Sequence, residues 1–233
     1  MYHNENFKKS AKSFYKEIVF KDSYRFKQFH PDYFDFVLDI GANVGIFSLF
    51  AAMRHTRSRI FAFEPSKQTY EWLYHHVDFA SNIKAYRGAL GDGSELCLNE
   101  TGYSGCNTFL KPSTIKQKYG DDKYEKTQSY TLEQIFDNLQ LDPKEKFFVK
   151  MDCEGGERFL LNDKRSTDLL SHADGIGMEV HFRSKQERFH TFPEWKEYHT
   201  WVENTFQDTH SISYHSSNKN LGTGMYTIVK QEF

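Results

Sequence analysis

The chain has 233 residues, which is enough for one domain with a sizeable core. Its 30 Lys and Arg residues against 32 Asp and Glu residues give a formal net charge of −2, so it lacks the excess positive charge of a nucleic-acid-binding protein. The three cysteines, Cys97, Cys106 and Cys153, have neither metal-site nor disulfide spacing, which predicts reduced thiols in a cytoplasmic protein. The N-terminus "MYHNENFKKSAKSFYK" lacks the apolar core of a signal peptide, and no stretch reaches the ~18 apolar residues of a membrane span, so we expect no membrane partner.

Apolar strands and amphipathic helices alternate along the chain. The predicted strands lie at residues 34–40, 59–65, 82–90, 146–152 and 175–181, and the predicted helices at 44–54, 67–80, 131–139 and 195–206. Residues 211–217 and 224–232, separated by a glycine-containing turn, are typical of a closing antiparallel pair. This alternation predicts an α/β fold with a doubly wound, mostly parallel sheet flanked by helices.

Two regions do not follow this alternation of strands and helices. We expect residues 1–33 to form an N-terminal helical extension of a domain at 34–233, and they carry no motif that indicates a role. Residues 91–126 are polar, rich in Gly, Ser, Lys and Tyr, and longer than an ordinary connection. Such a segment is typical of a lid, a binding loop or a disordered insert, and these alternatives remain open.

The stretch "FDFVLDIGANVGIFSLFAAMR" has the order of a nucleotide-binding strand, turn and helix. Gly41 permits a tight turn, and Gly45 permits close packing of the helix on the strand. Asn43 replaces the middle glycine that a dinucleotide pyrophosphate requires, and its amide suits a smaller zwitterionic group such as the amino-acid end of S-adenosylmethionine. Glu64 ends the second strand, 23 residues after Gly41, where an acid commonly accepts both ribose hydroxyls.

Further polar residues follow the later strands. Asp152 ends the fourth strand in "KMDCEGGE", with Glu154 close behind, and Glu179 and His181 end the fifth strand in "MEVH". The carboxyl ends of parallel strands meet at one edge of the sheet, so we expect these side chains to lie near the glycine turn.

These motifs together resemble the FkbM family of S-adenosylmethionine-dependent methyltransferases. The resemblance rests on "VLDIGANVGIFSLFAA", "IFAFEPSKQTYEWL", "GALGDG", "SYTLEQIF", "FVKMDCEGGERFLL" and "MEVH", in that order, and covers roughly residues 35–181. The sequence departs from the family pattern at Cys153, where valine is frequent, and at Gly156, where alanine is frequent. The resemblance implies a Rossmann-like methyltransferase fold with a seven-stranded sheet and methyl transfer to a hydroxyl of a small molecule, often a sugar or glycan.

By position, the resemblance also assigns cofactor-binding residues. The methionine end of S-adenosylmethionine would be surrounded by Asp39, Gly41, Asn43 and Gly45. Glu64 would hold the ribose. Gly88 and Ala89 would lie near the adenine, with Asp92 as a further candidate.

A hydroxyl is a weak nucleophile until it loses its proton, so methyl transfer needs a general base. His181 is the first candidate because a neutral imidazole is available at pH 7, and Asp152 is the second, with Glu154 and Glu179 as neighbouring acids. A divalent cation held by Asp152, Glu179 and His181, Mg²⁺ or Mn²⁺, is an alternative that we do not favour because the ligand spacing is not diagnostic.

Two other functions remain open from the sequence. The first is a nicotinamide-dependent oxidoreductase on a Rossmann sheet, which the missing middle glycine disfavours. The second is a binding protein that keeps the cofactor pocket without turnover, which the acids and the histidine disfavour. Protection from thermal unfolding by S-adenosylhomocysteine, but not by NAD, would separate methyltransferase from oxidoreductase.

Overall fold

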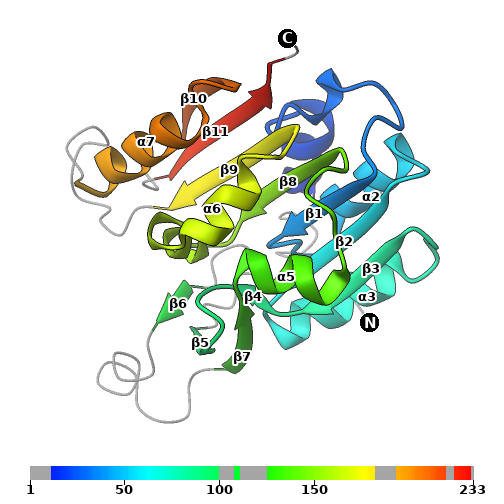
Figure 1. Ribbon diagram of the computed structural model, residues 1–233. Coiled ribbons are helices and arrows are strands. Elements are labelled where there is room, and N and C mark those ends of the chain that lie inside the picture. The colour runs from blue at the N-terminus through cyan, green and yellow to red at the C-terminus, as the bar shows by residue number, and fades with distance from the viewer. Residues whose placement is uncertain (1–11, 100–107, 111–124, 182–192, 219–222, 232–233) are drawn as a thin grey trace.

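The computed structural model describes residues 12–99, 108–110, 125–181, 193–218 and 223–231. A seven-stranded sheet with helices on both faces forms the body of the molecule (Figure 1). The strand order is β10 (His210–Asn218), β11 (Thr223–Lys230), β9 (Gly175–His181), β8 (Phe147–Asp152), β1 (Phe36–Ile40), β2 (Arg59–Glu64) and β3 (Ile83–Arg87). This order confirms the predicted doubly wound sheet.

The middle of the sheet is parallel and its edge is antiparallel. Strands β3, β2, β1, β8 and β9 pair in parallel, whereas β11 runs antiparallel to β9 and to β10. All five residues of β1 are buried, as expected for a strand covered on both faces. The closing antiparallel pair predicted at the C-terminus is confirmed.

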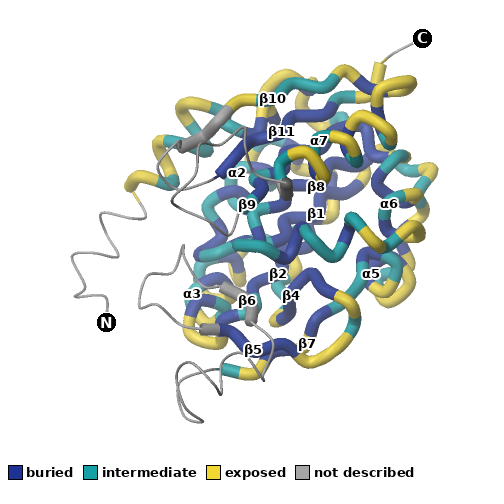
Figure 2. The backbone as a smooth tube through the Cα atoms, turned by 90° about the vertical axis from the view of Figure 1, so that its left-hand side faces the viewer, coloured by how far each residue is buried: buried dark blue, intermediate teal, exposed yellow. Residues whose placement is uncertain are grey.

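The two faces of the sheet carry different helices. Helices α5 (Leu132–Leu139), α6 (Lys164–Leu170) and α7 (Pro193–Phe206) cover one face, and α2 (Ile46–Arg54) and α3 (Lys67–Val77) cover the other (Figure 1). Side chains alternate along a strand, so Leu38 of β1 packs on the first face and Val37 on the second. Figure 2 shows the main-sheet strands as a largely buried layer.

Helix starts follow local side-chain chemistry. Ser66 caps α3 by accepting the backbone N–H of Thr69, and Thr131 and Gln134 form a reciprocal capping box at the start of α5. The helix α6 was not predicted, although Asp163 caps it by accepting the N–H of Ser166. Residues 156–162, which follow the motif after β8, form 3₁₀ turns.

The strand predicted at residues 82–90 is divided. Its first part is β3, and its last two residues, β4 (Ala89–Leu90), pair in a second sheet of order β4-β7-β5-β6. The strand is interrupted at Gly88, where an added Cβ would lie 2.6 Å from the ring of Tyr130.

Part of the segment that was predicted as a lid, loop or insert belongs to the second sheet. It contains β5 (Glu95–Asn99), β6 (Thr108–Leu110) and β7 (Glu125–Tyr130), and β5 pairs antiparallel with both others. Residues 100–107 and 111–124 lie outside the described part of the chain. The prediction that this segment covers a pocket is therefore untested there.

The segment that precedes β1 in the sequence packs against the main sheet. It contains helical turns over residues 12–20 and a 3₁₀ turn (Phe26–Gln28), as the predicted helical extension requires. Tyr24, Phe26 and Phe29 are buried in the same core as α2 and α3. The division into an extension and a domain stays a prediction.

Within the described residues, no helix combines the length and the apolar character that crossing a membrane requires.

Candidate active site

A cavity opens beyond the carboxyl ends of the central strands, with about 920 Å³ of empty space that is partly open to solvent. The position agrees with the rule that ligands of open α/β sheets bind at this edge. The predicted site residues that line it are Gly41, Asn43, Glu64, Gly88, Ala89, Asp152, Glu154 and Glu179. The cavity therefore brings the glycine turn and the acids after β8 and β9 together.

The glycine turn depends on close backbone contact. Gly41 has φ +76°, and a Cβ placed there would lie 1.8 Å from the carbonyl oxygen of Asp152. Gly45 has φ +87°, and its missing Cβ makes room for Leu73 of α3 at 2.8 Å. The expected helix–strand packing at Gly45 is thus wrong: this glycine lets α2 approach another helix.

The buried carboxylate of Glu64 stabilises this turn through two hydrogen bonds to backbone N–H groups. Its carboxylate accepts the N–H of Asn43 at 3.0 Å through one oxygen and the N–H of Ser66 at 3.0 Å through the other. Asn43 itself has φ +51°, a left-handed conformation that asparagine tolerates better than most residues. Burial raises the pKa of Glu64 to about 7, against which the two N–H donors act.

Asp39 lies beneath the turn rather than on the cavity wall. It is fully buried, accepts the hydroxyl of Ser48 at 2.5 Å, and pairs with Lys150 Nζ at 3.2 Å. Lys150 also donates to the carbonyl oxygen of Gly41, so the ion pair holds the backbone of the turn. Asp92 accepts the N–H of Ser94 at 3.0 Å in an exposed turn and is not among the cavity-lining residues.

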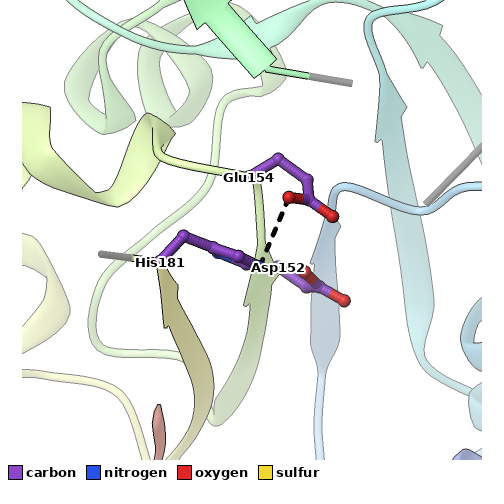
Figure 3. Close-up of side chains that lie close together, drawn as sticks. All are labelled: Asp152, Glu154 and His181. Atoms are coloured by element: carbon purple, nitrogen blue, oxygen red, sulfur yellow. Dashed lines mark ion pairs between the residues drawn. The ribbon is translucent and has the colours of Figure 1, made fainter. Parts of the chain in front are cut away.

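Three side chains lie close together where β8 and β9 end (Figure 3). Asp152 and Glu154 line the cavity, whereas His181 is not among the cavity-lining residues. Asp152 ends β8, Glu154 follows in the next loop, and His181 ends β9. The Nε2 atom of His181 lies 3.7 Å from Asp152 Oδ1 and 3.6 Å from Glu154 Oε2.

Glu157 contacts both His181 and the loop that carries Glu154. It is fully buried, and Oε1 lies 3.3 Å from His181 Nδ1 and accepts the N–H of Cys153 at 2.8 Å. Its second oxygen accepts the N–H of Gly155 at 3.0 Å. One carboxylate therefore fixes both the loop after β8 and the orientation of the imidazole.

The charges of this cluster differ from the sequence-based expectation. Burial lowers the pKa of His181, but Glu157, Glu154 and Asp152 outweigh it and raise this pKa to about 10. Burial likewise raises the pKa of Glu154 to about 8, although His181 opposes the shift. The direction of this shift favours the protonated imidazole at pH 7, whereas the sequence analysis expected a neutral one.

The same three residues have the spacing of a cation site. One ligand atom from each of Asp152, Glu154 and His181 lies within 4.8 Å of the others, and such donors suit Mg²⁺ or Mn²⁺. Glu179, which we expected among the ligands, lines the cavity but does not join this group. Partly exposed acids also gather in proteins without any ion, so the spacing alone assigns no metal.

The N-terminal segment also lines the cavity, which was not predicted from the sequence. Phe14, Glu17, Ile18 and Tyr24 line the cavity, and Tyr24 donates its hydroxyl to Asp152 Oδ2 at 3.2 Å. The available signal was the pair of glycines in "GIGMEVH", since a glycine inside a strand often marks a close approach.

A family model described as the methyltransferase FkbM domain matches residues 39–207, which is most of the chain and includes the glycine turn and the acidic cluster. The chain belongs to this family. The predicted resemblance is confirmed.

Curated relatives match over shorter stretches. "Methyltransferase 1" of Beauveria bassiana (strain ARSEF 2860) is 29% identical over 93 residues, which is 39% of this chain and 36% of the relative. "Methyltransferase sdnD" of Sordaria araneosa is 31% identical over 87 residues, 36% of this chain and 33% of the relative. The match thus spans about a third of the length of these relatives.

Solved structures agree on the fold. The crystal structure of methyltransferase FkbM from Methylobacillus flagellatus KT matches with a TM-score of 0.50 and 16% identity, over 84% of this chain and 44% of that one. The structure of an rRNA methylase from Streptococcus thermophilus matches with a TM-score of 0.52 and 10% identity, over 91% and 97%. At these identities the matches support the methyltransferase fold alone.

Proposed function

We propose that this protein is an S-adenosylmethionine-dependent O-methyltransferase that acts on a hydroxyl group of a sugar or glycan. The proposal rests on one observation: the glycine turn and the acids after β8 line the same cavity. Asn43 of the glycine turn and Glu64 line one part, which we take as the cofactor end, and Asp152 and Glu154, beside His181, line another part, which we take as the acceptor end. Membership of the FkbM methyltransferase domain family favours this function over the oxidoreductase.

The residues at the first end fit the cofactor. Glu64 is buried at the cavity wall, and its carboxylate retains acceptor capacity for ribose hydroxyls beyond the two backbone N–H groups. Asn43 lines the wall where a zwitterionic group would need a hydrogen bond, and Gly88 and Ala89 leave room for a flat ring. When bound, S-adenosylmethionine supplies a methyl group on a positively charged sulfur.

The residues at the second end would handle the hydroxyl proton. A general base works best when its pKa is near the operating pH, and the pKa of Glu154, about 8, meets this condition. We therefore assign proton acceptance to Glu154 and orientation of the hydroxyl to Asp152. His181, protonated and held by Glu157, keeps the two carboxylates together.

The partners and the setting follow the same reasoning. The acceptor is a small molecule or glycan rather than nucleic acid, because the formal net charge is −2. Cys97 and Cys153 are buried free thiols, which supports a reducing, cytoplasmic location.

The test is methyl transfer from labelled S-adenosylmethionine to a panel of glycans, sugar nucleotides and natural-product alcohols, with RNA as a separate arm. Turnover should rise with pH through about 8, the pKa of Glu154. Glu154→Gln should lower turnover by about 10²-fold. Glu145→Gln, at the opposite edge of the sheet, is the control and should keep full turnover.

Two outcomes would change the assignment. Unaltered turnover in Glu154→Gln together with a loss of about 10²-fold in His181→Ala would place the base on the histidine instead. Loss of turnover in EDTA, with recovery in Mg²⁺ or Mn²⁺, would assign activation of the hydroxyl to a cation. Methylation of RNA alone would overturn the proposed acceptor class.

A further inference from the structure

Tyr24 lies on the acceptor side of the cavity, although it comes from the segment before the first strand. Its ring is buried and packs edge-on against Phe47 of α2, with 5.6 Å between ring centroids. A Cβ on Gly177 of β9 would lie 2.7 Å from the Cβ of Tyr24. The glycine in β9 thus creates the space into which this tyrosine fits.

The tyrosine hydroxyl gives the two oxygens of Asp152 different surroundings. It donates to Oδ2 at 3.2 Å, whereas Oδ1 lies 3.7 Å from His181 Nε2. Because both contacts act on one carboxylate, they restrict its rotation about the bond to Cβ. The hydroxyl remains a donor at neutral pH, since burial and the charge of Asp152 raise the pKa of Tyr24.

Other residues of the same segment extend this wall. Phe14, Glu17 and Ile18 line the cavity next to Tyr24. Burial raises the pKa of Glu17, and the charge of Asp152 adds to the shift, so the two acids face the same space. The N-terminal segment therefore encloses the end of the cavity at which an acceptor would meet Asp152.

We propose that Tyr24 is a positioning residue for methyl transfer, and that its hydroxyl fixes the Asp152 carboxylate in the orientation that receives the acceptor hydroxyl. This inference rests on the proposed function, because it takes Asp152 to act at the acceptor. It adds that residues 14–24 form the acceptor-side wall of the site.

The test is Tyr24→Phe, which removes only the hydroxyl. The expected result is about a tenfold fall in kcat, because a misplaced group costs rate rather than cofactor affinity. The dissociation constant for S-adenosylhomocysteine should change by less than about twofold. In an Asp152→Ala background, adding Tyr24→Phe should have almost no further effect on kcat, because the two residues act as one unit.

Tyr33→Phe is the matched control. Tyr33 comes from the same segment and donates to a carboxylate, Asp174 Oδ1, at 3.3 Å, but at the opposite edge of the sheet. This variant should keep full kcat. A fall in kcat equal to that of Tyr24→Phe would show that loss of any buried hydroxyl bond from this segment is enough, and would overturn the proposal.

The remaining outcomes separate this inference from the proposed function. Full kcat in Tyr24→Phe, with a large loss in Asp152→Ala, would overturn the inference alone. Full kcat in Asp152→Ala would overturn the role of Asp152 and the inference with it.

Crystal structures of the wild type and Tyr24→Phe with S-adenosylhomocysteine give a readout that needs no acceptor. The Asp152 carboxylate should rotate in the variant, and an unchanged carboxylate would overturn the inference.

Discussion

The two ends of the cavity are built in different ways. At the end proposed for the cofactor, a short stretch of backbone turns through Gly41, Asn43 and Gly45, and one carboxylate, Glu64, accepts two of the N–H groups around it. At the end proposed for the acceptor, side chains from β8, β9 and the N-terminal segment converge. Here too a buried carboxylate, Glu157, accepts two backbone N–H groups.

The comparison teaches which parts of such a site depend on local sequence. A turn that requires positive φ needs glycine or asparagine at fixed offsets, whatever the rest of the chain does. A cluster of side chains needs several elements to be placed first. The two ends should therefore respond differently to substitution, and matched pairs of variants can test this.

The largest effect should follow from Gly41→Ala. The added Cβ would meet the carbonyl of Asp152 at 1.8 Å in a left-handed backbone conformation, and we expect a loss of about 2–4 kcal/mol in unfolding free energy. Cofactor binding should disappear. The measurements are denaturant unfolding and calorimetry with S-adenosylhomocysteine.

Gly155→Ala is the control for that substitution. Gly155 has φ +107°, but nothing lies within 4 Å of a Cβ placed there. The unfolding free energy of this variant should fall only by the cost of the strained backbone conformation, about 1–2 kcal/mol. Equal losses in the two variants would show that close approach to Asp152 is unimportant.

The two buried carboxylates offer the next test. Glu157→Ala removes the acceptor of the Cys153 and Gly155 N–H groups, and we expect about 2–4 kcal/mol of lost stability because buried donors are left unpaired. Turnover should fall while affinity for S-adenosylhomocysteine stays within about twofold. A large loss of cofactor affinity would show that the two ends are not independent.

Glu64→Ala should have the opposite signature. It removes the group assigned to the ribose hydroxyls, and cofactor affinity should fall by about 1.5–3 kcal/mol, as for hydrogen bonds to a charged group. Calorimetry at pH 8, where Glu64 is largely ionised, measures this loss. Unchanged affinity would remove Glu64 from the cofactor site.

Cofactor affinity should also depend on pH through Glu64. The charged carboxylate is the better acceptor for ribose hydroxyls, so binding favours the ionised form and lowers its pKa in the complex. Affinity should be constant above about pH 7, the pKa of Glu64 in the free protein, and should weaken by up to tenfold per pH unit below it. Glu64→Gln cannot ionise there and should flatten the dependence.

The smallest effect should come from Asp92→Asn. The family resemblance makes Asp92 a candidate near the adenine, but the structure places it in an exposed turn outside the cavity wall. Affinity for S-adenosylhomocysteine should stay within about twofold. A tenfold loss would extend the cofactor end to this turn.

The two ends also differ in how far the sequence predicts them. The order of the main strands, and the places of Gly41 directly after β1 and of Glu64 at the end of β2, could be predicted because apolar periodicity and turn chemistry are local. The break at Gly88 was missed because β3 and β4 follow one another with a single residue between them, and their division depends on pairing with different strands, β2 and β7.

At the acceptor end, the strand ends predicted that Asp152 and His181 would lie close together, and they do. The protonation state of His181 could not be predicted, because it depends on Glu157, Glu154 and Asp152 at once. Tyr24 could not be assigned because its partner lies 128 residues away in the chain.

That separation has a consequence for how the protein is made. The tyrosine at position 24 leaves the ribosome long before β8 and β9, so the carboxylate that its hydroxyl contacts does not exist during most of synthesis. The contact of its ring with Phe47 joins segments close in the chain and can form early, whereas contacts of high sequence separation form late. A nascent chain halted before β9 would therefore lack Gly177 and His181, the residues of β9 that complete the surroundings of Tyr24 and Asp152.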